Sequence, residues 1–265
     1  MPATTTAIRW RFPATKTRSA MTIFRNVVFV AALAGLFAGL VMTAMQTAFT
    51  VPLILEAEAY EGAGAEEGAA TEEAHDHDAA AGHSHGDEAW MPADGLERTF
   101  YTALAAVVTG IGFALLLVVG SELAGGIAGW RQGLFWGFAG FSVFTLAPGL
   151  GLPPELPGMP AADLFARQVW WIGTVVATAG GLALIALTRS AALAALGAAL
   201  IVLPHVIGAP QPESHDTLVP ADLHHSFVVA VTMTNLVFWL ALGAAVGVLR
   251  PRFAQGLGEP QSSLA

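Results

Sequence analysis

The chain has 265 residues, of which 55% are apolar and only 12% are charged, about half the charged share of an average soluble domain. This composition excludes an ordinary water-soluble fold and predicts a protein that uses the lipid bilayer as its solvent. The sequence contains no cysteine, which excludes disulfides and thiolate metal sites. It has no basic stripe beyond its N-terminal segment, so nucleic acid is not an expected partner.

Residues 1–25 precede the first apolar segment and carry five basic side chains. These are Arg9, Arg11, Lys16, Arg18 and Arg25. The apolar run that follows is too long for the core of a signal peptide and lacks a small-residue cleavage site. We therefore expect an uncleaved signal-anchor with a cytoplasmic N-terminal segment; Met21 is a second candidate for the first residue.

Six apolar segments predict an all-α membrane protein with six transmembrane helices in a domain spanning residues 26–253. The segments are residues 27–55, 100–120, 133–147, 169–187, 191–207 and 227–249. Each is near the ~20 residues that cross the hydrocarbon core. The third and fifth are short enough to be tilted, re-entrant or buried helices instead. Residues 254–265 follow as a tail.

The basic residues indicate how the spans are oriented. Six spans place four later basic residues on the same side as the N-terminal segment: Arg131, Arg189, Arg250 and Arg252. Only Arg98 and Arg167 fall on the other side, together with every acidic residue except Glu122 and Glu259. Because cytoplasmic loops carry the excess of Lys and Arg, we expect both termini to be cytoplasmic.

A weak internal repeat accompanies the spans. MPADG at 91–95, MPAAD at 159–163 and VPADL at 219–223 precede the second, fourth and sixth spans, and proline followed by aspartate is typical of a helix start. The first, third and fifth spans end near Pro52, Pro148 and Pro204. The pattern predicts three helical hairpins in parallel repeat, a device of transporters. The alternative is three unrelated helix starts at one membrane surface.

Small residues in three spans predict close helix contacts. The pairs Gly35 with Gly39, Gly133 with Gly137, and Gly243 with Gly247 have G-x-x-x-G spacing, which allows helix backbones to approach closely in lipid. Chance spacing in a chain rich in alanine and glycine is the alternative explanation.

The external loop at residues 62–90 is acidic, rich in alanine and glycine, and expected to be disordered. It contains His75, His77, His83 and His85 in two H-x-H pairs. Imidazole and carboxylate ligands suit Co²⁺, Ni²⁺ and Zn²⁺. We expect a collector of divalent cations with modest affinity; the alternative is a solvated linker.

Polar residues also lie at the outer ends of the spans. Gln46 lies within the first span, Glu56, Glu58 and Glu61 follow it, and Glu155 and His205 end the third and fifth spans. Polar groups at membrane depth are costly and usually face a pathway. A site drawing on Gln46, Glu56, Glu58 and His205 is predicted to bind a transition metal, unless His205 only hydrogen-bonds a carbonyl. His224 and His225 are expected at the interface, and Trp170 and Trp171 in an aromatic belt.

The chemistry that the sequence lacks narrows the function. Lys16 is the sole lysine, so no phosphate-binding P-loop is available, and we expect no enzymatic activity. A divalent cation that enters down ~100 mV, inside negative, gains roughly 4.6 kcal/mol, enough for about a thousandfold accumulation. Import is therefore favoured, and proton-coupled efflux is the weaker alternative.

Five stretches resemble the CbtA family of predicted cobalt transporter subunits. They are FRNVVFVAALAGLFAGLVMTAMQ (24–46), VPLILEAEAYE (51–61), WGFAGFSVFTLAPGLGLPPELPG (136–158), RQVWW (167–171) and LPHVIGAPQP (203–212). The resemblance extends from Met21 to Phe253. It implies cobalt import across the cytoplasmic membrane, by a protein often encoded beside cobalamin synthesis genes. It also implies a small single-span companion, CbtB, that carries a histidine motif.

The resemblance also implies which residues occupy the family's motif positions. They are Gln46, Glu56, Glu58, Glu61, Glu155, Trp170, Trp171 and His205. Family members are commonly drawn with about five spans, whereas the charges here favour six. A metal sensor, or an accessory subunit that delivers metal to another carrier, is the alternative function. The choice among cobalt, nickel and zinc, and the number of copies in a homo-oligomer, stay open.

Overall fold

The computed structural model describes residues 15–60, 92, 93 and 95–255, and gives only the backbone for residues 15–20, 254 and 255. Within these residues every regular element is a helix, which confirms the predicted all-α class. The elements are α1 (Thr15–Met45), the π-helical turn η1 (Gln46–Thr50), α3 (Leu96–Leu123), α4 (Trp130–Phe141), the π-helical turn η2 (Ser142–Leu146), α5 (Ala147–Gly151), α6 (Leu164–Leu187), α7 (Ala191–Ile207) and α8 (Ala221–Gln255). Residues 51–60 continue the helix beyond η1.

Five helices of the described residues are long and apolar enough to cross a membrane. They are Met21–Tyr60, Leu96–Leu123, Trp130–Gly151, Leu164–Leu187 and Ala221–Phe253. The remaining predicted span is α7, an apolar helix of 17 residues, which lies at the lower limit of about 17 residues for a spanning helix. Five of the six predicted spans are thus confirmed by length and composition, and the sixth stays a prediction.

Two span boundaries differ from the prediction because prolines do not end these helices. The first helix continues through Pro52 to residue 60, and the third reaches Gly151, beyond Pro148. In both, a π-helical turn ends two residues before the proline, with η1 ending at Thr50 and η2 at Leu146. A π-helical turn is wider than an α-helical one, so it leaves room for the proline ring and its missing N–H.

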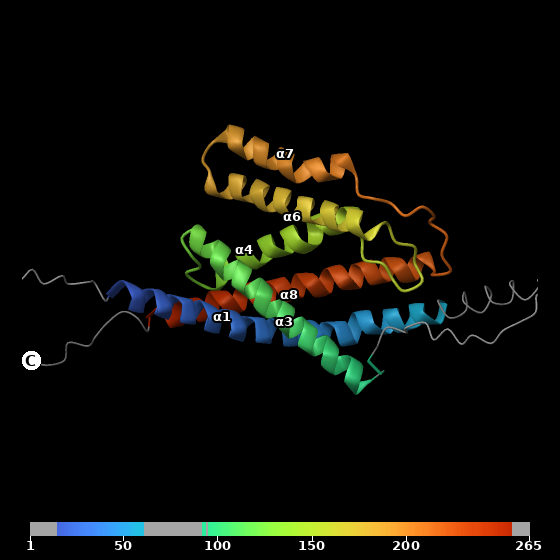
Figure 1. The fold of residues 1–265 in the computed structure, drawn as a ribbon, viewed down its shortest axis with the longest axis horizontal. Coiled ribbons are helices and arrows are strands. Elements are labelled where there is room, and N and C mark those ends of the chain that lie inside the picture. The colour runs from blue at the N-terminus through green and yellow to red at the C-terminus, as the bar shows by residue number, and fades with distance from the viewer. Residues whose placement is uncertain (1–14, 61–91, 94, 256–265) are drawn as a thin grey trace, which may run out of the picture.

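The helices alternate in direction (Figure 1), as six successive passes would require. α1, α4 and α7 run one way, and α3, α6 and α8 return. The loops and helix ends that carry Arg131, Arg189, Arg250 and Arg252 therefore gather at one end of the molecule, which we call the arginine-rich end. Arg98 and Arg167 lie near the starts of α3 and α6, at the opposite end.

The helices pair differently from the predicted hairpin repeat. α1 packs against α3, as the first hairpin requires, but α4 packs chiefly on α8, and α7 on α6. A layer formed by α6 and α7 therefore lies on one side of the bundle made by α1, α3, α4 and α8 (Figure 1). In the second predicted hairpin only η2 and α5 pack on α6, while α4 packs on α8; in the third, α7 packs chiefly on α6.

Glycine contacts explain this pairing. Gly133 and Gly137 of α4 face Gly243 and Gly247 of α8, so that a Cβ on any of them would overlap the partner's backbone. Gly35 and Gly39 make equally close approaches to α3, and Gly181 of α6 approaches Gly197 of α7. The G-x-x-x-G prediction is confirmed: these residues allow the backbone contact that drives helix association where lipid removes the usual hydrophobic gain.

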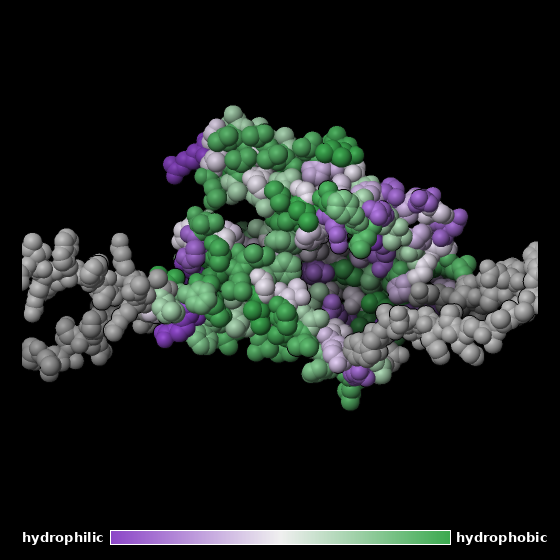
Figure 2. All heavy atoms as spheres, in the orientation of Figure 1, coloured by the Kyte–Doolittle hydropathy of each residue, from purple (hydrophilic) through white to green (hydrophobic). Residues whose placement is uncertain are grey.

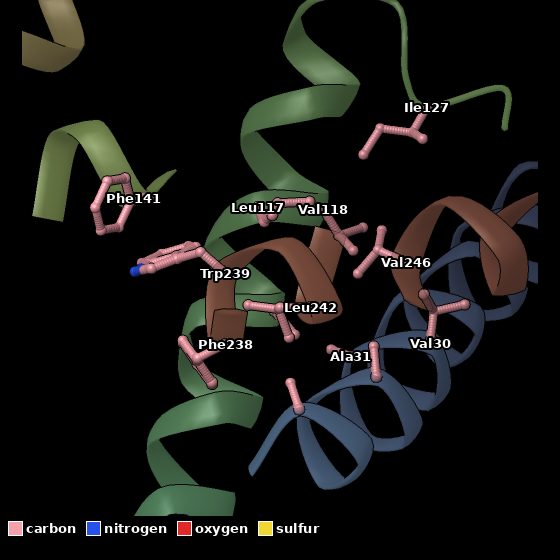
Figure 3. Packing of buried hydrophobic residues seen from close by; sticks show 13 residues of the cluster. Val30, Ala31, Leu117, Val118, Ile127, Phe141, Phe238, Trp239, Leu242 and Val246 are labelled. Atoms are coloured by element: carbon pink, nitrogen blue, oxygen red, sulfur yellow. The ribbon is translucent and has the colours of Figure 1, made fainter. Parts of the chain in front are cut away.

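The main core lies where α1, α3 and α8 meet (Figure 3). Val30, Val118, Leu242 and Val246 are almost fully buried there, and Trp239 of α8 extends from this cluster toward α4. The Trp239 ring stacks on Phe144 with centroids 5.5 Å apart. Trp239 thus joins the α1–α3–α8 core to η2, on the side toward α6.

The exterior is apolar over most of the face drawn in Figure 2. Large exposed hydrophobic side chains occur along all of the long helices, and hydrophilic side chains gather mainly at the two ends of the molecule and in a recess over α1 and α8. This distribution suits a multi-pass membrane protein, because the shafts of the helices would contact lipid and their ends would contact water.

Candidate functional site

The predicted metal-binding loop lies outside the described residues. His75, His77, His83 and His85 belong to it, and Glu61, which directly precedes it, also lies outside the described residues. The structure describes the helix that leads into the loop and the start of α3 that follows it.

A second, smaller core organises the end of the molecule opposite the arginine-rich end. Ala57, Leu156 and Leu223 are buried together, and they come from the end of the first helix, the loop after α5 and the start of α8. Four of the polar residues singled out from the sequence adjoin these core residues in the chain: Glu56, Glu58, Glu155 and His224. We call this group the outer cluster.

Two carboxylates of the outer cluster are paired with arginine. Glu58 Oε1 lies 2.6 Å from Arg98 Nη2, and Glu155 Oε2 lies 3.1 Å from Arg167 Nη2. These arginines are the two basic residues that the charge pattern placed apart from all the others. Each pair is partly exposed, so it adds little stability, but it compensates the negative charge of a carboxylate that could otherwise bind a cation.

The histidines of α8 lie beside the same loop. His224 Nε2 is 3.1 Å from the carbonyl oxygen of Pro154, the residue before Glu155, whereas His225 is exposed. As a donor to this carbonyl, Nε2 carries the proton and leaves Nδ1 as the acceptor. Glu56, unlike Glu58, is exposed and makes no ion pair with a described residue.

His205 does not join the outer cluster, so the predicted site of Gln46, Glu56, Glu58 and His205 is not assembled. The His205 ring meets Trp170 edge to face, with centroids 5.9 Å apart, and the Trp170 Nε1–H donates to the Pro204 carbonyl at 3.3 Å. The physical reason is the glycine-mediated packing of α7 on α6, whereas η1, which holds Gln46, packs on α8. Among the described residues, no group of three or more acidic or histidine side chains is placed to hold a metal ion.

The paired tryptophans have packing roles beyond an aromatic belt. Trp170 links α6 to the proline of α7, and Trp171 approaches Phe144 of η2 with ring centroids 6.3 Å apart. Trp170 thus joins the two helices of the α6–α7 layer, and Trp171 connects this layer to η2.

Sequence reasoning missed the polar residues inside the helices. Thr234 of α8 is 1% exposed, and its hydroxyl makes no hydrogen bond within the described structure. Thr178 of α6 is 2% exposed, and its hydroxyl likewise makes no hydrogen bond within the described structure. The available signal was the run Thr-Met-Thr-Asn at 232–235, which is unusually polar for the interior of an apolar span.

The chain matches a known protein family over most of its length. A model of the CbtA family, described as a probable cobalt transporter subunit, matches residues 24–250. No curated protein and no solved structure matches the chain. Because the family model covers most of the sequence, the chain belongs to the CbtA family. A transporter subunit has a transport role rather than a catalytic one, and the word subunit implies a partner.

Proposed function

We propose that this chain imports cobalt, as the divalent cation, across the cytoplasmic membrane, with its arginine-rich end and both termini in the cytoplasm. The observation that carries the proposal is the match of residues 24–250 to the family. The gathering of Arg131, Arg189, Arg250 and Arg252 at one end supports the orientation, because positive charge is retained on the cytoplasmic side.

The outer cluster is the proposed receiving point for the cation. The histidines of the external loop, His75, His77, His83 and His85, would collect the metal and raise its concentration beside Glu56, Glu58 and Glu155. Their imidazoles and carboxylates suit borderline divalent ions. The arginine partners of Glu58 and Glu155 make each carboxylate available only to a ligand that can displace a guanidinium, which favours a divalent cation over a monovalent one.

Import needs no further energy source in this proposal. Moving two positive charges down ~100 mV releases roughly 4.6 kcal/mol. A small single-span companion of the CbtB kind would complete the transporter, with further copies of this chain compatible with the same scheme. Nickel and zinc are the closest competitors, because the same ligand types serve all three ions.

Metal accumulation in cells that lack their own cobalt uptake tests this function. Cells would express the chain with and without the small companion, and cobalt, nickel and zinc would be compared. We expect cobalt to accumulate, and deletion of residues 66–88 to weaken uptake mainly at low external cobalt. His205→Ala would show whether the imidazole on α7 acts as a separate ligand. No uptake of any metal, with cobalt still bound by the loop, would overturn the proposal in favour of a sensor or accessory subunit.

A further inference from the structure

Three threonines of the first helix use their hydroxyl protons within that helix. Thr43 Oγ1 donates to the Gly39 carbonyl at 2.8 Å, Thr47 to Thr43 at 2.9 Å, and Thr50 to Gln46 at 3.1 Å. A hydroxyl that donates its proton still has lone pairs to offer. Thr43 and Thr50 are buried, so this part of the helix presents acceptor oxygens in its interior-facing surface.

These threonines lie in and beside the π-helical turn η1. The Val51 N–H bonds the Gln46 carbonyl, five residues back. The Gln46 side-chain amide is half-buried and makes no hydrogen bond within the described residues. Single π-helical turns are rare and are concentrated at functional sites.

The register of α1 against α8 identifies what faces η1. The two helices run antiparallel: Asn26 Nδ2 donates to the Phe253 carbonyl at 3.1 Å, and Ala57 packs with Leu223 and Phe227 at the other end. Residues near 46 therefore lie opposite residues near 234, and η1 packs on α8.

The α8 segment opposite η1 is also rich in acceptors. Thr234 lies on the same helical face as Phe227 and Phe238, both of which belong to clusters shared with the first helix, so its buried and unpartnered hydroxyl points toward that helix. Asn235 Nδ2 donates to the Val231 carbonyl at 2.9 Å, which leaves its Oδ1 free. Figure 2 shows hydrophilic side chains in the recess over α1 and α8.

The polar groups of η1 and of the α8 segment opposite it together define the chemistry of a ligand that would bind between them. The segment holds neutral amide and hydroxyl groups, and neither η1 nor residues 230–238 include a charged side chain. Thr50 and Asn235 each donate a proton within their own helix and keep an oxygen that can accept, and the side-chain oxygens of Gln46 and Thr234 have no partner among the described residues. Four neutral oxygens that can each accept a hydrogen bond suit a ligand rich in donors. The water molecules bound to a divalent cation are such donors, and neutral amide and hydroxyl oxygens can accept from them without binding the ion tightly.

We propose that Gln46, Thr50, Thr234 and Asn235 form an intramembrane site that binds a divalent cation together with its bound water. The site deepens the proposed transport function and rests on it. Along the first helix the site lies between the outer cluster and the arginine-rich end. A cation moving toward the arginine-rich end would therefore reach it after the outer cluster.

Thr234→Val tests the site, because valine keeps the shape of threonine and removes only the hydroxyl. Cobalt uptake is expected to fall about fivefold to tenfold, the factor for one hydrogen bond. The unfolding temperature is expected to stay the same or rise, since a buried hydroxyl without a partner destabilises the folded state. If Thr234 had only a structural role, its replacement would not lower cobalt uptake while keeping or raising the unfolding temperature.

Thr178→Val is the matched control. Thr178 is equally buried and unpartnered, but it lies on the face of α6 that packs on α7, three residues before Gly181. It is expected to raise the unfolding temperature without changing uptake. Uptake by Thr234→Val within twofold of the parent, or an equal loss in Thr178→Val, would overturn the site while leaving the transport function intact.

A binding measurement separates the site from the transport function. Equilibrium dialysis with radioactive cobalt would use the purified full chain with all four loop histidines replaced by alanine, and the same protein with Asn235→Leu added. Weaker cobalt binding after Asn235→Leu supports the site even if no uptake is seen in cells. Unchanged binding overturns it. Failure of the parent to take up any metal bears on the transport function instead.

Discussion

The crossing of α4 and α8 offers a direct test of how this bundle is held together. In Gly243→Ala, the new Cβ would lie 2.8 Å from both Cα and N of Gly137, and closer still to the Gly133 carbonyl oxygen. Ordinary carbon contacts are about 3.5–4.0 Å, so the helices must separate by roughly 0.7–1.2 Å. Every atom in the way belongs to backbone, so no rotamer change can relieve the overlap.

The expected cost follows from the overpacking of a tight interior. Such changes cost about 1–3 kcal/mol, and the rigid neighbours here place Gly243→Ala near 3 kcal/mol. Thermal unfolding of the purified protein in detergent should show a midpoint lowered by about 6–12 °C. The separation would also weaken the packing of Trp239, which reaches Phe144 from the next turn of α8.

Gly173→Ala is the control for this substitution. Gly173 lies in the interior of α6, and a Cβ there would meet no atom within 4 Å. Alanine is expected to be neutral there or to stabilise the helix by up to about 1 kcal/mol. If Gly243→Ala proved as stable as Gly173→Ala, the close backbone contact would not be what joins α4 to α8.

Three further substitutions test single interactions. Arg250→Ala removes a partly exposed ion pair with Glu122 and the hydrogen bond from Nη1 to the Ile127 carbonyl at 2.6 Å, and should cost about 0.5–1.5 kcal/mol in thermal unfolding. Trp170→Phe removes the indole donor to Pro204 but keeps an aromatic ring, and should cost about 0.5–1.5 kcal/mol by the same measurement. Arg98→Gln frees a carboxylate of the outer cluster and should lower the external cobalt concentration that gives half-maximal uptake.

Each of these expectations has its own contradicting result. Arg252→Ala, at an exposed position near the same end of α8, should be close to neutral, and an equal loss in both variants would assign the effect to net charge. Trp170→Leu should cost more than Trp170→Phe if the ring contact with His205 matters. An unchanged half-maximal concentration in Arg98→Gln would show that its ion pair does not compete with the metal.

The class of the protein and most of its spans could be predicted from the sequence because lipid imposes a strong and local constraint. A run of apolar residues must form a helix that satisfies its own backbone hydrogen bonds. The helix starts were also predictable: Asp163 caps α6 by accepting from the Ala166 N–H at 2.8 Å. These signals depend on neighbours along the chain and need no knowledge of the tertiary structure.

The pairing of helices and the assembly of the site could not be predicted in the same way. Glycine pairs occur in α1, α4 and α8, and their spacing does not say which partner each will meet. Because α4 packs against α8 and α6 packs against α7, His205 lies in the α6–α7 layer and Gln46 lies against α8. The predicted metal site was assembled from residue types in separate spans. It therefore combined side chains that the helix packing keeps apart.

Two prolines show how a sequence signal was given the wrong structural meaning. Pro52 and Pro148 were predicted to end helices, yet each follows a π-helical turn within a continuing helix. Both turns pack on α8, and η2 meets that helix where the Phe144 ring stacks on Trp239. The two prolines therefore mark two widened turns that both contact α8. A π-helical turn accommodates a proline without ending the span, which is why the position of a proline alone could not locate the end of either helix.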